Sequence, residues 1–317
     1  MDIRKHYFLD EWVIFSPRRK ERPFDFKNVK KNTISKKECV FCPKNSHKIE
    51  KELGHTGGDK SWEIKWFKNK FPAIDELLTF KNTKNINHEK KLQKYLESKQ
   101  VYGFHEIIVE TPHHTKQIYD FDKNKLFEVI KVYKLRYDNM INKKHIKYVS
   151  LFKNQGVKAG ASIYHAHSQM IGLNKIPPDI IKKRKKSLKG DICEYCKIID
   201  KEKQSERCCF KNKDFIAITP YASKFHYEIW ILSKKHKTSF DFNEKELRNL
   251  SDILYNILKK IKKLKCDFNV LFQIDKKLHF HIEIIPRIDY FAGFEWSSGI
   301  IINTTLPESA AIFYKSK

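Results

Sequence analysis

Two histidines separated by one residue, His165 and His167, follow a segment rich in glycine, alanine and serine. Ser168 and Gln169 come directly after them. In an extended strand, residues i and i+2 project from the same face, so both imidazoles should face one site. A neutral imidazole can bind a metal ion or act as a base or a nucleophile. The segment therefore predicts a site that other parts of the chain must complete.

Four of the seven cysteines form two CxxC pairs, Cys39 with Cys42 and Cys193 with Cys196. Zinc takes four nitrogen or sulfur ligands in a tetrahedron, and each pair offers two thiolates from one tight turn. A redox pair of the thioredoxin type would lie between a strand and a helix, whereas we expect both pairs to lie in polar loops. We therefore predict two zinc sites.

Histidines should complete both zinc sites. The candidates are His113, His114 and His165 for the first site, and His236 with either His279 or His281 for the second. Because both halves of the chain show the same order of signals, the paired ligand sets are Cys39, Cys42, His114 and His165, and Cys193, Cys196, His236 and His279. We expect structural or surface roles for Cys208, Cys209, Cys266, His47, His55, His88, His105, His145 and His226.

The order of signals along the chain occurs twice. Each half has a CxxC pair, a strand that leads to a histidine, a helix, a second strand and an HxH strand. Asn243 and Glu246 have the spacing of a capping box at the start of the second helix, over 243–264, and the first helix is expected over 122–143. We predict an α+β protein with two related lobes, 1–180 and 181–317, in which helices pack on an antiparallel sheet.

Composition limits the other classes of function. The chain has 317 residues, of which 40% are hydrophobic, and this is enough for two cores. Its formal charge of +26 would attract nucleic acid, but the lysines are not clustered with arginine and aromatic residues. A zinc-stabilised nucleic-acid-binding protein is therefore the alternative of another class. The basic run over 182–189 is expected to be a solvated linker. The sequence shows neither a signal peptide nor a membrane-spanning run, so we expect a cytoplasmic protein without membrane partners.

Six segments resemble the galactose-1-phosphate uridylyltransferase family, a branch of the histidine-triad superfamily, and they occur in the family's order. They are EWVIFSPRRKERPFDF, CVFCP, NKFPAI, HEIIVETPHH, KNQGVKAGASIYHAHSQ and GFEWSSGIIINTTLPESAA. The family's signature usually reads HPH, whereas Ala166 stands in the middle here and Ser168 follows. These departures, the second CxxC pair and the ending GFEWSSGIIIN are similar to the ADP-glucose phosphorylase branch. The resemblance implies two duplicated histidine-triad-like lobes.

The resemblance also assigns roles to individual residues. It implies that His167 is a nucleophile that carries a nucleoside monophosphate, that His165 binds zinc, and that Gln169 stabilises charge on the phosphoryl oxygens. A glycine-containing loop before the HxH segment could let the backbone approach phosphate closely. The residues expected to bind substrate are Arg19, Arg22, Asn69, Phe71, Asn154, Gly156, Ser162, Ser168, Phe294, Glu295 and Asn303.

The implied reaction moves a nucleoside monophosphate between a nucleotide sugar and a sugar 1-phosphate through a nucleotidyl-histidine. UDP-glucose and galactose 1-phosphate are the expected substrates, as for a galactose-1-phosphate uridylyltransferase. The alternatives within this class use inorganic phosphate to cleave ADP-glucose or a dinucleoside polyphosphate. A second copy of the chain, in a homodimer, is a further candidate partner, although no segment of the sequence identifies an interface.

Overall fold

The computed structural model describes residues 2–17, 36–59, 61–74, 76, 101–190 and 192–316. Arg19 and Arg22 lie outside this part of the chain. The helices are α1 (Lys123–Ile141), α2 (Pro178–Ser187), α3 (Glu194–Glu202), α4 (Glu244–Leu264), α5 (Gly293–Ser298) and α6 (Pro307–Lys315), with 3-10 helices η2 (Pro43–Lys48), η4 (Ile118–Asp120) and η5 (Val157–Ala159). The strands are β1 (Asp2–Lys5), β2 (Trp12–Phe15), β3 (Glu52–Gly58), β4 (Ser61–Lys68), β5 (Gly103–Val109), β6 (Tyr148–Gln155), β7 (His167–Leu173), β8 (Leu188–Lys189), β9 (Ile192–Cys193), β10 (Cys208–Lys211), β11 (Phe215–Ile218), β12 (Ile229–Ser233), β13 (Phe268–Asp275), β14 (Leu278–Pro286) and β15 (Ile301–Asn303).

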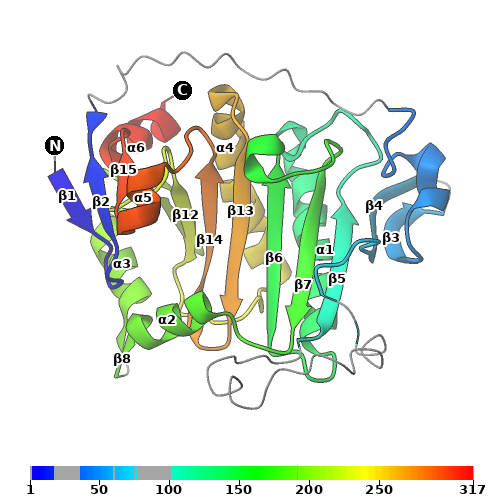
Figure 1. Cartoon of the computed structure of the whole chain (residues 1–317), viewed down its shortest axis with the longest axis horizontal. Helices are drawn as coiled ribbons and strands as arrows, with labels where there is room; N and C mark the ends of the chain where they lie inside the picture. Colours follow the sequence, from blue (N-terminus) through cyan, green and yellow to red (C-terminus); the bar gives the residue numbers. More distant parts are fainter. Residues whose placement is uncertain are drawn as a thin grey trace, which may run out of the picture.

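One large sheet joins the two halves of the described chain, in the strand order β10-β11-β12-β14-β13-β6-β7-β5-β4-β3. Neighbouring strands are antiparallel, and each half has the same order when it is read outward from the central pair β13 and β6 (Figure 1). His167 of β7 is paired with Val109 of β5, and His281 of β14 is paired with Leu232 of β12. The two HxH segments therefore occupy equivalent places, which confirms the predicted duplication.

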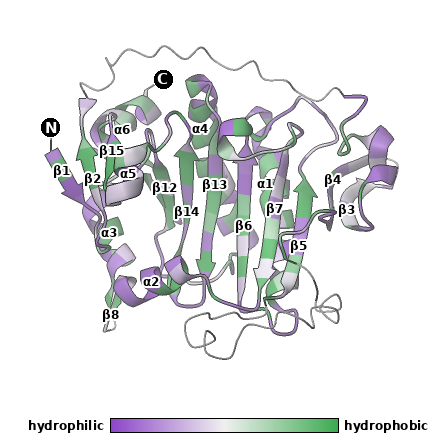
Figure 2. Ribbon diagram, in the orientation of Figure 1, coloured by the Kyte–Doolittle hydropathy of each residue, from purple (hydrophilic) through white to green (hydrophobic). Residues whose placement is uncertain are grey.

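Helices α1 and α4 lie against each other on one face of this sheet (Figure 1). The capping box of α4 forms as predicted: the Asn243 side chain accepts from the Glu246 backbone N–H at 3.0 Å, and the Glu246 carboxylate accepts from the Asn243 N–H at 2.9 Å. At α1 the Asp122 side chain accepts from the Lys125 backbone N–H, without a reciprocal bond, so both helices begin at the predicted caps. Polar and apolar bands alternate along β13 (Figure 2), as expected for a strand with one face packed on helices.

Two local expectations are wrong. Most of the run over 182–189 is helical, since residues 182–187 form the second part of α2, and three of its basic side chains are paired with distant carboxylates rather than only solvated. Lys183 lies 2.6 Å from Glu283, and Arg184 forms an ion pair with Asp275. The second CxxC pair is not in a loop: Cys193 is the last residue of β9, and Cys196 lies in the first turn of α3. Helix α2 spans the predicted boundary between the lobes, after residue 180, and this boundary stays a prediction.

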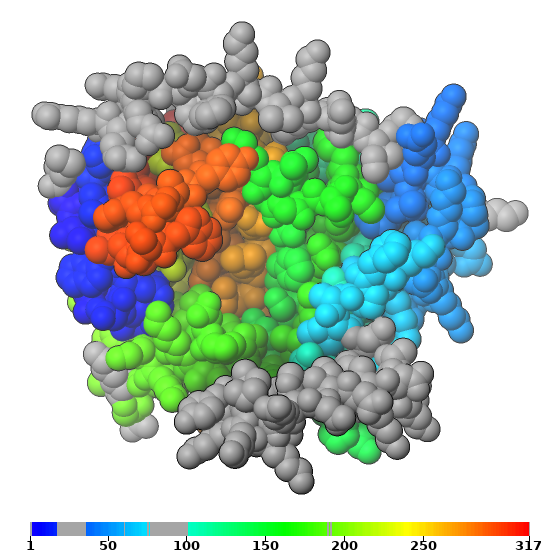
Figure 3. Space-filling view, viewed as in Figure 1, coloured from blue at the N-terminus to red at the C-terminus, as the bar shows by residue number. Residues whose placement is uncertain are grey.

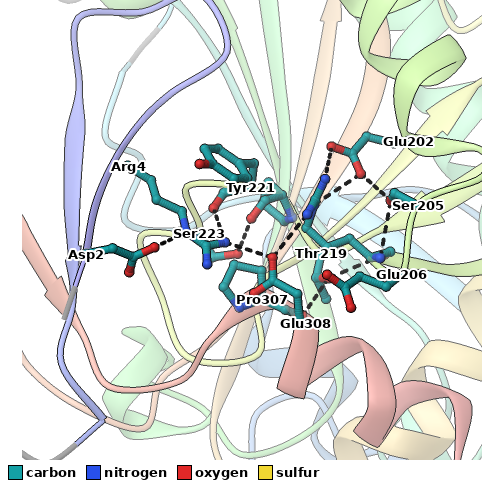
Figure 4. Close-up of polar contacts among 12 residues, drawn as sticks. Asp2, Arg4, Glu202, Ser205, Glu206, Thr219, Tyr221, Ser223, Pro307 and Glu308 are labelled. Atoms are coloured by element: carbon teal, nitrogen blue, oxygen red, sulfur yellow. Dashed lines mark hydrogen bonds and ion pairs between the residues drawn. The ribbon is translucent and has the colours of Figure 1, made fainter.

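A small sheet of β1, β2 and β15 packs at the end of the second half (Figure 1). Arg4 of β1 donates to the Glu308 carboxylate of α6 at 2.8 Å, and Arg207 donates to the same carboxylate at 3.0 Å (Figure 4). Glu202 of α3 accepts from Arg207 as well. This network joins the first strand of the chain to the second half. None of the helices in the described part of the chain is both long and apolar enough to span a membrane.

Candidate active site and metal centres

The first predicted ligand set comes together in space. Cys39, Cys42, His114 and His165 are all buried, and their ligand atoms lie within 4.8 Å of one another. The Nδ1 atom of His165 lies 3.7 Å from Cys39 Sγ and 3.6 Å from Cys42 Sγ. Tetrahedral zinc with bonds of about 2.3 Å to sulfur and about 2.0 Å to nitrogen places S and N roughly 3.6 Å apart. These four residues therefore fit a zinc ion.

The second ligand set has the same geometry. Cys193, Cys196, His236 and His279 form a cluster in which Cys196 and His236 are more exposed than the other two. His279 Nδ1 lies 3.7 Å from Cys193 Sγ and 3.6 Å from Cys196 Sγ. In both clusters the other ring nitrogen of the HxH histidine donates to a carbonyl oxygen at 2.7 Å, from His165 to Thr111 and from His279 to Ser233. This contact fixes the tautomer in which Nδ1 can bind metal.

His167 stands apart from the cluster and lines a cavity. Its Nδ1 lies 2.8 Å from the carbonyl oxygen of His165, which can only accept, so Nδ1 carries the proton and Nε2 has a free lone pair. Burial, with a smaller contribution from the cation of Lys153, lowers the pKa of His167 to about 4. The ring of Phe41 contacts both His165 and His167, at centroid distances of 6.3 and 5.1 Å. His167 is therefore held as a neutral, oriented base.

A buried ion pair supports the strand beneath His167. Lys153 donates to the Glu110 carboxylate at 2.8 Å and to the backbone carbonyl of His167 at 2.9 Å. The hydroxyls of Tyr133 and Ser168 each lie 2.6 Å from the same carboxylate. Burial opposes ionisation of Glu110, but Lys153 and these hydroxyls outweigh it and lower its pKa. Ser168 thus faces helix α1, bonds within this network and is not among the residues that line the cavity beside His167.

The cavity beside His167 has a volume of about 990 Å³. This is large enough for a nucleotide-sized ligand. The residues expected at the site that line it are His167, Gln169, Asn69, Phe71, Asn154 and Ser162. Gly156 does not line this cavity: it has φ +85°, and an added Cβ would lie 2.1 Å from Asp267. The positive φ and the close approach of Asp267 are each sufficient to require glycine there.

His105, for which the sequence indicates only a structural or surface role, contacts a residue of the site. Its Nδ1 accepts from the backbone N–H of Ala73 at 3.1 Å, so its Nε2 carries the proton and donates to Gln169 Oε1 at 3.0 Å. Gln169 is left with its NH₂ group as a donor in the cavity. The residue type alone gave no signal of this role. The role depends on the register of β5 and β7, which pairs His105 with Ile171, two residues from Gln169.

Three residues expected to bind the sugar do not line the cavity. Phe294 and Glu295 lie on α5, which a hollow over β13 and β14 separates from the first half of the sheet (Figure 3). That hollow contains a second cavity of about 550 Å³, lined in part by Leu271 and Glu283. Asn303 is fully buried in β15, where its side chain donates to two backbone carbonyls and accepts from Thr305 N–H. Phe294, Glu295 and Asn303 are therefore not among the residues that line the cavity of His167 in their own chain.

Comparison with known proteins agrees with this geometry. Residues 2–177 match the sequence profile of the galactose-1-phosphate uridyl transferase N-terminal domain. The ADP-glucose phosphorylase of Arabidopsis thaliana is 29% identical over 326 residues, which cover 98% of this chain and 91% of that protein. The galactose-1-phosphate uridylyltransferase of Thermotoga maritima is 24% identical, over 98% of this chain and 96% of that protein.

Solved structures show the same fold. The crystal structure of the Arabidopsis thaliana ADP-glucose phosphorylase with bound ADP-glucose matches 100% of this chain and 99% of that chain, with a TM-score of 0.79 and 25% identity. A solved uridylyltransferase matches 99% of this chain and 97% of its own, with a TM-score of 0.73 and 22% identity. The expected α+β fold of two histidine-triad-like lobes is thereby confirmed.

Proposed function

The chain belongs to the galactose-1-phosphate uridylyltransferase family, and we propose that it transfers a nucleoside monophosphate from a nucleotide sugar to a sugar 1-phosphate through His167. The observation that carries this proposal is the state of His167. Its Nδ1 proton is engaged by the His165 carbonyl, and the residue lines a cavity of nucleotide size. The nitrogen that remains, Nε2, is the one that can attack phosphorus.

The reaction would take place in two balanced displacements. In the first, the Nε2 lone pair of His167 attacks the α-phosphorus of the nucleotide sugar. A P–N bond forms, and the bond from phosphorus to the bridging oxygen breaks, so that sugar 1-phosphate leaves with the electron pair. In the second, a phosphate oxygen of the acceptor attacks the same phosphorus and Nε2 leaves. The NH₂ groups of Gln169 and Asn154 would donate to the non-bridging oxygens, where negative charge increases.

We assign zinc to both Cys/His clusters, because their sulfur–nitrogen distances fit tetrahedral coordination. Four protein ligands leave no open position, so each ion would act as a cross-link. The first would join the turn of Cys39 and Cys42 to the segment that carries His167, and would hold Phe41 against that ring. The second would join α3 to β14 in the same way.

UDP-glucose and galactose 1-phosphate remain the proposed substrates. A second candidate, the phosphorolysis of ADP-glucose, is favoured by a specific observation: the Arabidopsis thaliana ADP-glucose phosphorylase is 29% identical, compared with 24% for the Thermotoga maritima uridylyltransferase. Ala166 between the two histidines and the second CxxC pair support this candidate too. In either reaction the first step forms the same kind of bond to His167, so the two candidates differ in the nucleotide that is carried and in the acceptor of the second step.

A homodimer would explain the positions of Phe294 and Glu295. Both residues are on α5, on the far side of the hollow from the cavity of His167, and the side chain of Phe294 is 45% exposed. We propose that they reach a nucleotide sugar in the cavity of a second copy. Phe294→Ala would then raise KM for the sugar substrate in the dimer without changing the cavity of its own chain.

The test of the proposed function is the intact mass of the protein after brief exposure to UDP-glucose or to ADP-glucose, without any acceptor. We expect a gain of one uridylyl or one adenylyl group, with release of an equal amount of sugar phosphate. The bond should be labile in acid and stable in alkali, as expected for a phosphoramidate. Turnover of either substrate with no adduct at any time point would contradict the proposal.

A further inference from the structure

Asn269 of β13, in the second half of the chain, contacts the loop over residues 156–161 in the first half. It is paired in register with Asn154 of β6. Its Nδ2 donates to the carbonyl oxygen of Ala159 at 2.8 Å and to Asn154 Oδ1 at 2.8 Å. Since a carbonyl oxygen can only accept, the contact with Ala159 identifies which end of the Asn269 amide is nitrogen. Asn269 Nδ2 also donates to the Asn154 side chain, so the atom of Asn154 that faces it must be the acceptor, Oδ1.

This contact decides which group Asn154 offers to the cavity. Its oxygen is turned toward Asn269, so its NH₂ group is turned toward the loop, where an added Cβ at Gly160 would lie 3.7 Å from Asn154 Nδ2. Asn154 and Gly160 line the same cavity as His167. A hydrogen-bond donor is therefore presented near the nucleophile, where the phosphoryl oxygens of a nucleotide would lie.

The loop itself is held from the second half at another point. The carboxylate of Asp267 accepts from the backbone N–H of Lys158 at 2.8 Å. Gly156, at the start of the loop, packs so closely on Asp267 that any side chain would collide with it. Asp267 and Asn269 together fix both the path of the loop and the orientation of the amide beside it.

We infer that Asn269 is a positioning residue for nucleotidyl transfer, which acts by holding the Asn154 amide and the 156–161 loop against the phosphoryl group. This inference rests on the proposed function and adds a requirement to it. The half of the chain that lacks the nucleophile would build part of the phosphate site of the other half. Asn269 does not line the cavity of His167, so its effect must pass through Asn154 and Ala159.

Two substitutions of similar size separate the effects of shape and hydrogen bonding. Asn269→Leu removes both donated hydrogen bonds. Asn154 keeps its NH₂ group but loses the bond that orients it, so adduct formation on His167 should slow by roughly 10-fold, the factor that corresponds to one net hydrogen bond. Asn269→Asp places an oxygen against Ala159 O and can accept from Asn154 only if that amide turns over. The Asn154 oxygen would then face phosphate, so Asn269→Asp should be slower than Asn269→Leu. Equal or faster transfer by Asn269→Asp would overturn the inference.

A double-mutant cycle tests the route of the effect. If Asn269 acts through Asn154, then Asn269→Leu should change the adduct rate much less in an Asn154→Ala background than in the wild type. If the fold-loss of adduct rate in the double variant equals the product of the two single-variant losses, the residues act independently and the inference is overturned. Asn212→Leu is the matched control, since Asn212 holds a turn between β10 and β11 by hydrogen bonds to Asn249 and Phe215. It should lower the melting temperature and leave the adduct rate unchanged.

Hydrogen exchange separates this inference from the proposed function. Asn269→Leu should speed amide exchange in residues 156–161 of the full-length protein, and Asn212→Leu should not. If the wild type forms no adduct with UDP-glucose or ADP-glucose, the proposed function fails, but exchange in this loop can still be measured. Unchanged exchange in Asn269→Leu overturns the inference whatever the activity.

Discussion

His281 occupies the place in the second half of the sheet that His167 occupies in the first. Each ring lies with its Nδ1 2.8 Å from the carbonyl oxygen two residues earlier, His279 or His165. The rings differ in what covers Nε2. Tyr195 packs on the His281 ring at a centroid distance of 4.5 Å, with its hydroxyl 3.4 Å from Nε2, and Glu283 Oε1 lies 3.3 Å from the same atom. The geometry of a nucleophile is thus present twice, but the second copy is blocked.

This pair of histidines gives the protein an internal control. We expect His167→Asn to abolish the covalent adduct and to reduce turnover by far more than the roughly 10²-fold to 10³-fold that follows the loss of one charge-stabilising donor. His281→Asn should lower the melting temperature, because a fully buried ring loses its partners, and should leave adduct formation intact. Intact-mass measurements on both variants check this prediction. If His167→Asn still forms the adduct and His281→Asn does not, then His281 is the nucleophile and the assignment is reversed.

A second prediction concerns His105, which orients Gln169. His105→Ala should free the Gln169 amide to turn over, so that it presents its NH₂ group to phosphate for only part of the time. Loss of one such hydrogen bond corresponds to about 1 kcal/mol, or roughly a 5-fold to 10-fold slower adduct formation. Gln169→Ala should have a larger effect, and the double variant should resemble Gln169→Ala alone. A His105→Ala enzyme with an unchanged single-turnover rate would contradict this role.

Metal binding should couple to folding in both halves. Cys39→Ser removes one thiolate from the first cluster, and Cys193→Ser removes one from the second, so each variant should lose close to one zinc ion per chain and melt at a lower temperature. Cys39→Ser should also slow adduct formation, because Phe41 and the His167 segment are adjacent to the first cluster. Elemental analysis with thermal unfolding provides the measurement. Cys266→Ser is the control, since Cys266 lies outside both clusters, and its metal content should not change.

The features predicted correctly from the sequence are local ones. The Asn243 and Glu246 capping box and the apolar spacing after it define α4 through contacts within one or two helical turns. The CxxC pairs and HxH segments predict the two Cys/His clusters, which could hold a metal ion, because these residue types at this spacing allow few other arrangements. Once the repeated order of these signals is recognised, two equivalent lobes follow from it.

The features that were missed depend on residues far apart in sequence. Lys153 and Glu110 are separated by 42 other positions, and a buried ion pair cannot be distinguished from two solvated charges until β6 and the end of β5 are placed. For the same reason the sequence alone indicates a solvated linker for the basic run before the second CxxC pair. Its partners, Glu283 and Asp275, come from β14 and β13. The orientation of Gln169 by His105 likewise depends on strand register, which the sequence does not state.

The final prediction concerns pH and a carboxylate that joins the β1–β2 turn to the second half. Glu11 lies 2.9 Å from Lys182 of α2 and 2.9 Å from Lys224 before β12. Burial opposes ionisation of Glu11, but the two ammonium groups outweigh it and lower its pKa to about 2. Since this pKa is below that of an unfolded glutamate, about 4.3, the pair stabilises the fold fully above about pH 5 and loses this effect as the pH falls toward 2.

We therefore expect Glu11→Gln to reduce the free energy of unfolding by about 1 kcal/mol at pH 7, a value discounted because the carboxylate is partly exposed. The difference between wild type and variant should shrink as the pH is lowered from about 5 toward 2. Glu63→Gln serves as the control, because Glu63 pairs with Lys125 while its side chain is 60% exposed, and it should change stability little at any pH. Urea unfolding of the three proteins at a series of pH values gives the comparison. The difference in free energy of unfolding between wild type and Glu11→Gln could instead stay constant or grow as the pH falls. In that case these lysines do not stabilise the fold through the charge of Glu11.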